Sequence, residues 1–219
     1  MWFKNLREDI KAAKRNDPAA RYGLEILLTY SGVHALSWHR IAQFFYKIKL
    51  KLIARIISQF ARFLTGIEIH PAAKIEGGVF IDHGAGVVIG ETAEVHKGTV
   101  IYQGVTLGGT GKEQGKRHPT IMENVTLSAG AKVLGGFTVG KGAKIGAGAV
   151  VLKEVPPYAT VVGVPGRIVR IRVPDQEPTS RDGIIAVAAL NAEINAEQAA
   201  EKEERAKRLA EQAEEARKK

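Results

Sequence analysis

The sequence predicts an α + β fold in three parts: an N-terminal α-helical cap, a left-handed parallel β-helix of hexapeptide repeats, and a charged, helical C-terminal tail. Three patterns support this division. Apolar residues recur at helical spacing within residues 1–66, and aliphatic residues recur every six positions within residues 67–173. Residues 174–219 open with two prolines and are then rich in Ala, Glu, Lys and Arg, which is typical of a solvated appendage, helical from about Gly183.

The N-terminal segment carries signals for helix starts and ends. Asp17-Pro18 predicts a helix start, with Asp17 as the N-cap and Pro18 at the first helical position, and Gly66 is expected to end the last helix. Between them runs an apolar stripe at helical spacing: Ile41, Phe45, Ile48, Leu52, Ile56 and Phe63. With its lysines and arginines, the stretch 38–64 could lie on an anionic membrane surface. We favour a helical cap core, because soluble helices commonly flank such stripes with Lys and Arg.

A six-residue rhythm defines the central segment. Its aliphatic positions fall six apart within three groups: Ile69, Ile75 and Ile81; Ile89, Val95, Ile101 and Leu107; Ile121, Leu127, Val133, Val139, Ile145 and Val151. Each hexad is one short strand and a turn, and three hexads close one triangular coil. The residue two positions earlier also faces the interior and must be small, as at Ala73 and Ala85. The rhythm slips by two residues at Ala85–Val88 and by a longer insert after Leu107.

Composition restricts the classes of function. The chain has no cysteine, which argues against a disulfide framework and export. Its N-terminus is charged and no stretch of eighteen apolar residues occurs, so we expect no membrane span and a cytoplasmic location. The formal net charge is +9, carried by the first two segments, whereas the tail is net negative. A basic body suits polyanions, and we expect the phosphates of a nucleotide cofactor rather than nucleic acid or a membrane.

The insert after Leu107 reads GGTGKEQGKRHPT and is the first segment that suggests chemistry. An insertion that leaves a regular coil commonly carries function. Gly111-Lys112 is similar to the Gly-Lys pair of a phosphate loop. The spacing of the preceding glycines does not match that motif, however, and Glu113 stands where Ser or Thr is required. The insert therefore contributes Arg117 and His118, and arginine is suited to bidentate recognition of a carboxylate.

Two strings in the chain, IEIHPAAKIEGGVFIDHGAGVVIGETAEV and YQGVTLGGTGKEQGKRHPTI, resemble the serine O-acetyltransferase family in its short bacterial form. The resemblance runs from about Asp9 to Arg170. The hexads alone specify only the hexapeptide-repeat acyltransferase superfamily, whereas IDHGAGVVIGET together with LGGTGK and RHP is far more specific. The resemblance implies transfer of an acetyl group from acetyl-coenzyme A to the hydroxyl of L-serine, which is the first step of cysteine biosynthesis.

The resemblance also implies roles for individual residues. His83 matches the catalytic base and Glu68 its acidic partner, where many members have Asp. The positions that hold the amino acid are matched by Asp17, Asp82, Arg117 and His118. Those that line the acetyl-coenzyme A groove between adjacent subunits are matched by Gly109, Ala129, Lys144 and Ala147. No metal is implied.

The chemistry of these residue types fits that reaction. An imidazole can take the proton of a serine hydroxyl as the oxygen attacks the thioester, and a carboxylate fixes its tautomer. Two carboxylates, Asp17 and Asp82, suit an ammonium group, and Arg117 suits a carboxylate.

Each of these residues also has a structural interpretation. A His beside an Asp is commonly a surface pair, Asp17 can be a helix cap, and Arg117 with His118 can decorate a loop. The remaining candidates we assign to structure: His34, His39, His70 and His96.

Partners and alternatives follow from the same residues. We expect a homotrimer or a dimer of trimers, and L-cysteine as a feedback inhibitor competing with L-serine. The family's complex with O-acetylserine sulfhydrylase is doubtful, because that plug needs a C-terminal Ile and this tail ends Ala216-Arg217-Lys218-Lys219. Three alternatives stay open: an acetyltransferase for homoserine or a sugar, a γ-type carbonic anhydrase with three His around a metal, and an inactive scaffold.

Overall fold

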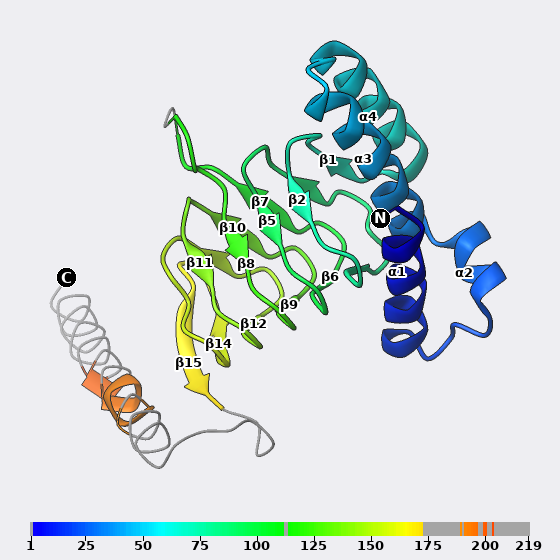
Figure 1. Ribbon diagram of the computed structural model, residues 1–219. Coiled ribbons are helices and arrows are strands. Elements are labelled where there is room, and N and C mark those ends of the chain that lie inside the picture. The colour runs from blue at the N-terminus through cyan, green and yellow to red at the C-terminus, as the bar shows by residue number, and fades with distance from the viewer. Residues whose placement is uncertain are drawn as a thin grey trace, which may run out of the picture. The chain divides into compact units, whose positions relative to one another are not determined.

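The computed structural model describes residues 2–111, 114–172, 189, 191–196, 199–200 and 203 (Figure 1). The chain divides into two compact units, Met1–Arg167 and Ile168–Lys219. The Gly111-Lys112 pair, the helix start expected near Gly183 and the terminal Lys218-Lys219 lie wholly or partly outside the described residues.

The first unit begins with the helices α1 (Trp2–Asn16), α2 (Gly23–Thr29), α3 (Ser31–Lys47) and α4 (Lys51–Thr65), which gather at one end of the β-helix (Figure 1). The predicted helix start at Asp17-Pro18 is wrong, because Asp17 follows the end of α1. The Asp17 N–H donates to the Ala13 carbonyl at 2.9 Å, so Asp17 ends the last turn of α1. The Asp17 carboxylate instead accepts the backbone N–H of Ala19 at 2.8 Å, closing a turn.

The helices α3 and α4 form a hairpin broken at Ile48–Leu50, where Lys49 has a φ of 67°. Gly66 ends α4 in the left-handed conformation, as predicted. The face of α4 that packs inward is made of small residues, Ala54, Ser58 and Ala61, and the Ser58 hydroxyl donates to the Ile69 carbonyl at 3.0 Å.

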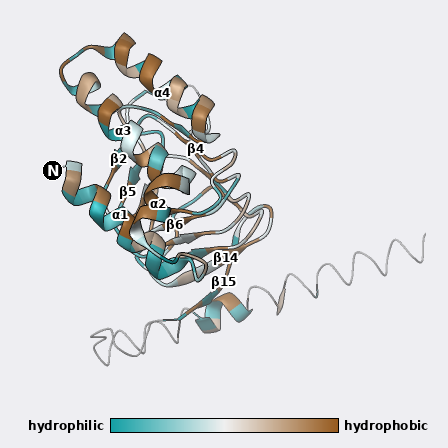
Figure 2. Cartoon of the chain, turned by 90° about the vertical axis from the view of Figure 1, so that its right-hand side faces the viewer, coloured by the Kyte–Doolittle hydropathy of each residue, from teal (hydrophilic) through white to brown (hydrophobic). Residues whose placement is uncertain are grey.

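The large apolar residues of α4 lie on its opposite face. Leu52, Ile56 and Phe63 are 75%, 60% and 84% exposed, and Figure 2 shows hydrophobic segments along this helix. The prediction that the stripe is the core of the cap is therefore wrong for α4 in the single chain. Small residues at helical spacing let α4 approach its neighbours closely, which turns the larger side chains outward.

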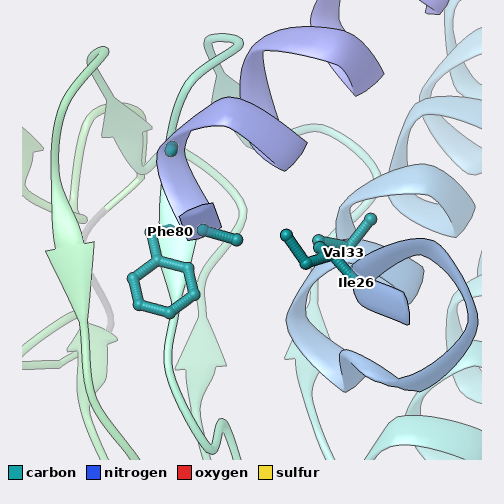
Figure 3. Packing of buried hydrophobic residues seen from close by; sticks show 5 residues of the cluster. Ile26, Val33 and Phe80 are labelled. Atoms are coloured by element: carbon teal, nitrogen blue, oxygen red, sulfur yellow. The ribbon is translucent and has the colours of Figure 1, made fainter. Parts of the chain in front are cut away.

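A buried ion pair ties α1 to α3 and to the β-helix. Asp9 Oδ2 lies 2.6 Å from Arg40 Nη1, with both side chains nearly inaccessible, and Asp9 Oδ1 accepts the backbone N–H of Gly78 at 2.9 Å. Burial raises the pKa of Asp9, and the hydrogen bond from Arg40 opposes that rise. Apolar contacts continue the junction, since Ile26 of α2, Val33 of α3 and Phe80 of β3 (Phe80–Ile81) belong to one buried cluster (Figure 3).

The β-helix is built from two- to four-residue strands, and from β1 to β13 each pairs in parallel with the strand three places along the chain. The last, β14, pairs in parallel with β12. The first face consists of β1 (Glu68–Ile69), β4 (Val88–Ile89), β7 (Thr106–Gly108), β10 (Lys132–Leu134) and β13 (Val150–Val151). The second face consists of β2 (Lys74–Ile75), β5 (Glu94–Val95), β8 (Thr120–Ile121) and β11 (Thr138–Val139). The third face contains β3 with β6 (Val100–Ile101), β9 (Thr126–Leu127), β12 (Lys144–Ile145) and β14 (Ala159–Val162). The predicted six-residue rhythm is thus confirmed as one strand per face and three strands per coil.

The interior is filled by the aliphatic positions of the rhythm. Ile89, Leu107 and Val133 are at most 1% exposed and stack from coil to coil, and burying each such side chain contributes about 1.5–3 kcal/mol. The expectation for Ala85 is wrong: Ala85 is exposed and Val87 takes the small interior position, fully buried. The two extra residues of this hexad are accommodated in the corner that precedes β4.

The second unit contains most of β15 (Arg167–Ile171), and residues 191–196 are helical. The side-chain amide of Asn191 accepts from the Ile171 N–H at 2.8 Å and donates to the Ile171 carbonyl at 2.9 Å. These two bonds imitate a pairing strand at Ile171. Among the described residues, no helix is both long and apolar enough to cross a bilayer.

Candidate active site

The edge between the third and first faces, here the third–first edge, carries His83 in its longest corner. His83 has a φ of 58°, and Gly84 and Gly86 beside it have φ of 74° and 73°. A non-glycine residue in this left-handed region is uncommon and marks a site of possible function. The imidazole is largely exposed, and its Nε2 lies 3.9 Å from Asp82 Oδ1.

Asp17 joins the same edge from the segment between α1 and α2. The hydroxyl of Tyr30 donates to Asp17 Oδ2, and this bond, with the bond from Ala19, lowers the pKa of the Asp17 carboxyl. His83 contributes to the same lowering, so its imidazole is within electrostatic reach of Asp17. The bond to Asp17 raises the pKa of Tyr30 to about 12, and Asp82 adds to that rise. The structure therefore brings Asp17, Asp82 and His83 together at one edge.

Glu68, the expected partner of His83, makes a different contact. Its Oε2 lies 3.0 Å from Arg62 Nη1 of α4, and its side chain is partly buried. The His83–Glu68 dyad therefore stays a prediction.

Arg117 and His118 lie on the edge between the first and second faces, here the first–second edge. They end the insert between β7 and β8, which stands out from the coils (Figure 1). Arg117 Nη2 lies 2.8 Å from Glu91 Oε2. The Thr92 hydroxyl oxygen accepts the backbone N–H groups of Arg117 at 3.1 Å and His118 at 3.0 Å. The end of the loop is therefore anchored to the turn that contains Glu91 and Thr92.

The His118 ring is fixed in position and tautomer. Its Nδ1 lies 2.9 Å from the Thr92 hydroxyl and accepts the Thr92 backbone N–H at 3.2 Å, which leaves the ring proton on Nε2. The ring packs directly over Gly90, where a Cβ would overlap it. His118 is only 8% exposed, and burial, assisted by the Arg117 charge, lowers the pKa of its imidazole. His118 is therefore a neutral Nε2–H donor near pH 7.

The expected groove residues do not all lie on one edge. Ala129 and Ala147 occupy adjacent coils of the third–first edge, where the Gly148 N–H donates to the Ala129 carbonyl at 2.9 Å. Lys144 is exposed on β12 of the third face. Gly109 instead begins the insert on the first–second edge, where a Cβ would lie 3.2 Å from the Arg117 carbonyl oxygen.

A column of glycines smooths the third–first edge beyond His83. Gly86, Gly104, Gly130 and Gly148 follow one another, one per coil, all with positive φ. A Cβ built on each of the first three would lie 3.5–3.9 Å from the Cα of the next. This stretch is therefore lined by backbone, and it leads from the His83 corner to the coils of Ala129 and Ala147.

Sequence reasoning missed four residues of this site: Tyr30, Ser31, Glu91 and Thr92. Glu91 and Thr92 lie in the IGET string, whose only sequence signal was its match to the family. His83 and Arg117 occupy different edges of the prism, so one chain does not bring them together. Within residues 2–111, 114–172 and the described part of the tail, no three His, Asp or Glu side chains converge as a metal site.

Comparisons with known proteins agree with one another. The family model for bacterial transferase hexapeptide (six repeats) matches residues 118–153. A serine acetyltransferase of Bacillus pumilus (strain SAFR-032) is 64% identical over 169 residues, which are 77% of this chain and 78% of that protein.

Two solved structures add ligands to the comparison. The serine acetyltransferase of Brucella abortus strain S19, in complex with coenzyme A, shares 46% identity with a TM-score of 0.74, and the match covers 77% of this chain and 67% of that one. A serine acetyltransferase in complex with cysteine shares 45% identity with a TM-score of 0.76, and the match covers 77% and 70%. The carbonic anhydrase and scaffold alternatives are not favoured by these comparisons.

Proposed function

This chain belongs to the serine acetyltransferase family, and from that premise we propose that it transfers the acetyl group of acetyl-coenzyme A to the hydroxyl of L-serine. The products are O-acetyl-L-serine, a precursor for cysteine, and coenzyme A. The observation that carries the proposal is the grouping of one exposed imidazole, His83, with two carboxylates, Asp17 and Asp82, at the third–first edge.

His83 acts as the general base. Its imidazole takes the proton of the serine hydroxyl while the oxygen attacks the thioester carbonyl, and the tetrahedral intermediate then releases the thiolate of coenzyme A. The imidazolium returns its proton to that thiolate, so no acyl-enzyme forms. Base catalysis of this kind is worth about 10²–10⁴-fold, and holding both substrates together supplies much of the remainder. Glu68 would stabilise the imidazolium on release from Arg62.

The charges of the site select an amino acid. Asp17 is ionised at neutral pH because its hydrogen bonds lower its pKa, and with Asp82 it receives the substrate ammonium. Arg117 and the Nε2–H of His118 receive the substrate carboxylate. One guanidinium nitrogen of Arg117 already donates to Glu91. This bond orients the remaining guanidinium N–H donors for a second carboxylate.

The active site is completed by a second copy of the chain. Because His83 and Arg117 lie on different edges, the third–first edge of one protomer must face the first–second edge of the next. Such a head-to-tail interface closes into a ring, and the triangular section of the prism suits a cyclic trimer. The hexamer remains the alternative assembly.

Acetyl-coenzyme A lies along the glycine column of the third–first edge. Because the glycine column is lined by backbone, it leaves room for the extended pantetheine arm, with Ala129 and Ala147 beside it. Lys144 is exposed and can bind the phosphates. Gly109 of the facing protomer lines the other wall. This placement directs the thioester toward His83 at the end of the column. We keep a cytoplasmic location, without nucleic-acid or membrane partners, as part of this proposal.

L-cysteine is proposed as a feedback inhibitor. It differs from L-serine by a thiol in place of the hydroxyl, so the groups that bind the serine ammonium and carboxylate bind it equally. Competition with L-serine follows.

A panel of acceptors tests the function. Thiol release from acetyl-coenzyme A is measured with L-serine, L-homoserine and a galactoside, and the product is identified by mass spectrometry. We expect O-acetyl-L-serine and a kcat/KM for L-serine at least about tenfold above that for L-homoserine, because an extra methylene displaces the hydroxyl from His83. Preferred acetylation of the galactoside would contradict the proposal.

A further inference from the structure

Tyr30 and Ser31 form the junction between α2 and α3, and both direct their side chains to the site. Tyr30 is the extended residue between the two helices, with φ of −89° and ψ of 107°. Ser31 opens α3, and Gly32 follows it. Tyr30 contacts Asp17, Ser31 contacts His83, and Gly32 lies against Ile81 of β3.

Tyr30 fixes Asp17. Its hydroxyl donates to Asp17 Oδ2, while the Ala19 N–H donates to Oδ1. Asp17 belongs to an irregular segment between α1 and α2, so regular helix bonds do not orient its side chain. Without the Tyr30 hydroxyl, the carboxylate keeps one neutral donor and can rotate away from His83.

Ser31 supports His83. Its hydroxyl donates to the His83 carbonyl at 3.2 Å, at the residue whose left-handed backbone is costly for a side chain larger than glycine. Gly32 lets the first turn of α3 pack directly against β3, the strand that leads into the His83 corner. A Cβ at Gly32 would collide with the Ile81 carbonyl oxygen. The helix start is therefore pressed against the corner that carries the base.

We infer that Tyr30 and Ser31 are positioning residues that set the substrate-ammonium carboxylate and the catalytic base relative to each other. Tyr30 acts through Asp17 on the affinity for the amino acid, and Ser31 acts through the backbone of His83 on turnover. The inference rests on the proposed function, since it assigns Asp17 to the ammonium and His83 to the hydroxyl. No general-base role for Tyr30 is involved, because its pKa of about 12 keeps it protonated.

The first test is Tyr30→Phe, which keeps the ring and removes the hydroxyl. We expect the KM for L-serine to rise about tenfold, the size typical of a lost hydrogen bond to a charged group, with kcat and the KM for acetyl-coenzyme A nearly unchanged. Tyr22→Phe is the matched control, since Tyr22 is an exposed tyrosine at the start of α2. An unchanged KM for L-serine in Tyr30→Phe, or an equal rise in Tyr22→Phe, overturns the inference for Tyr30.

A double-mutant cycle shows whether Tyr30 acts through Asp17. In the Asp17→Asn background, adding Tyr30→Phe should raise the KM by less than about twofold, because the group that Tyr30 orients has already changed. Full additivity overturns the inference while leaving the function intact. If Asp17→Asn itself leaves the KM for L-serine unchanged, the ammonium assignment and the inference fall together, so the two failures are distinguishable.

Ser31→Ala tests the second bond. We expect kcat to fall about threefold to tenfold at constant KM for L-serine, with Ser31→Thr restoring most of it because the hydroxyl returns. Ser37→Ala is the control, since the Ser37 hydroxyl bonds within its own helix, to the Val33 carbonyl. An unchanged kcat in Ser31→Ala, or a loss that Ser31→Thr does not restore, overturns the role of Ser31.

Discussion

Arg117 Nη2 lies 2.8 Å from Glu91 Oε2, joining the end of the insert to the turn that follows β4. Both side chains are about one-third exposed. The ion pair occupies one guanidinium nitrogen and leaves the other donors of Arg117 available, which is how the proposed site uses them for a substrate carboxylate.

Replacing Arg117 with lysine removes the planar fork and keeps the charge. We expect Arg117→Lys to raise the KM for L-serine about tenfold, because an ammonium cannot bind a carboxylate bidentately. Steady-state kinetics with acetyl-coenzyme A held saturating measure this. Arg21→Lys is the control, since Arg21, just before α2, forms a comparable pair with Glu25 of that helix at 2.7 Å. Equal KM values for wild type and Arg117→Lys would exclude carboxylate recognition by Arg117.

Removing the imidazole of His83 tests the base. His83→Ala should lower kcat by about 10²–10⁴-fold, while the Kd for coenzyme A, measured by calorimetry, stays within about twofold because the glycine column is untouched. His96→Ala serves as control, since His96 bonds Glu76 at 3.1 Å on a different edge. More than about a tenth of wild-type turnover in His83→Ala would remove His83 from the mechanism.

His39 makes the folded chain sensitive to acid. Burial on α3 lowers the pKa of its imidazole from 6.5 to about 3. Between these values the unfolded chain binds a proton that the folded chain does not. The contribution of His39 to the free energy of unfolding is therefore fully present above about pH 6.5. It decreases as the pH drops below that value, by up to about 1.4 kcal/mol per pH unit.

Thermal unfolding tests whether stability decreases with falling pH because of His39. The midpoint should fall more steeply from about pH 7.5 to about pH 5.5 in wild type than in His39→Gln, which cannot titrate. His96→Gln, at a more accessible histidine, controls for the replacement of a histidine in general. Parallel slopes for wild type and His39→Gln would contradict this account of His39.

Deleting residues 176–219 should leave acetyl transfer and inhibition by L-cysteine unchanged, because every proposed catalytic group lies within Met1–Arg167. The thermal midpoint should fall slightly, since the deletion removes both Asn191 bonds to Ile171. A tight complex with O-acetylserine sulfhydrylase that disappears on deletion would show that the tail is a partner site after all.

The β-helix was predictable because its information is local. Each interior position is set by residues six apart, so the stacking of Ile89 on Leu107 follows from sequence spacing alone. The same rule fails at Ala85, where two extra residues enter a corner and Val87 becomes the interior residue. Asp17 was misplaced because an N-cap and an Asx turn use the same residue types; the following proline favours the turn.

The residues of the candidate site could be predicted only where they lie in sequence motifs that match the family. Tyr30 reaches Asp17 across 13 residues, and Ser31 reaches His83 across 52. Such contacts follow from the packing of α3 on the β-helix and leave no periodic signal. The outward face of α4 was missed for a related reason, since a helical stripe does not show which of its faces is buried.

Subunit complementation tests most directly the claim that His83 and Arg117 of different protomers make one serine acetyltransferase site. His83→Ala and Arg117→Ala chains, each nearly inactive alone, are co-expressed in equal amounts, and serine acetylation is measured on the whole population of trimers. Because each site takes one edge from each of two neighbours, random assembly should restore about a quarter of wild-type turnover. Mixed trimers that stay as inactive as the parents would show that both residues serve the same site from one chain, and would contradict the account.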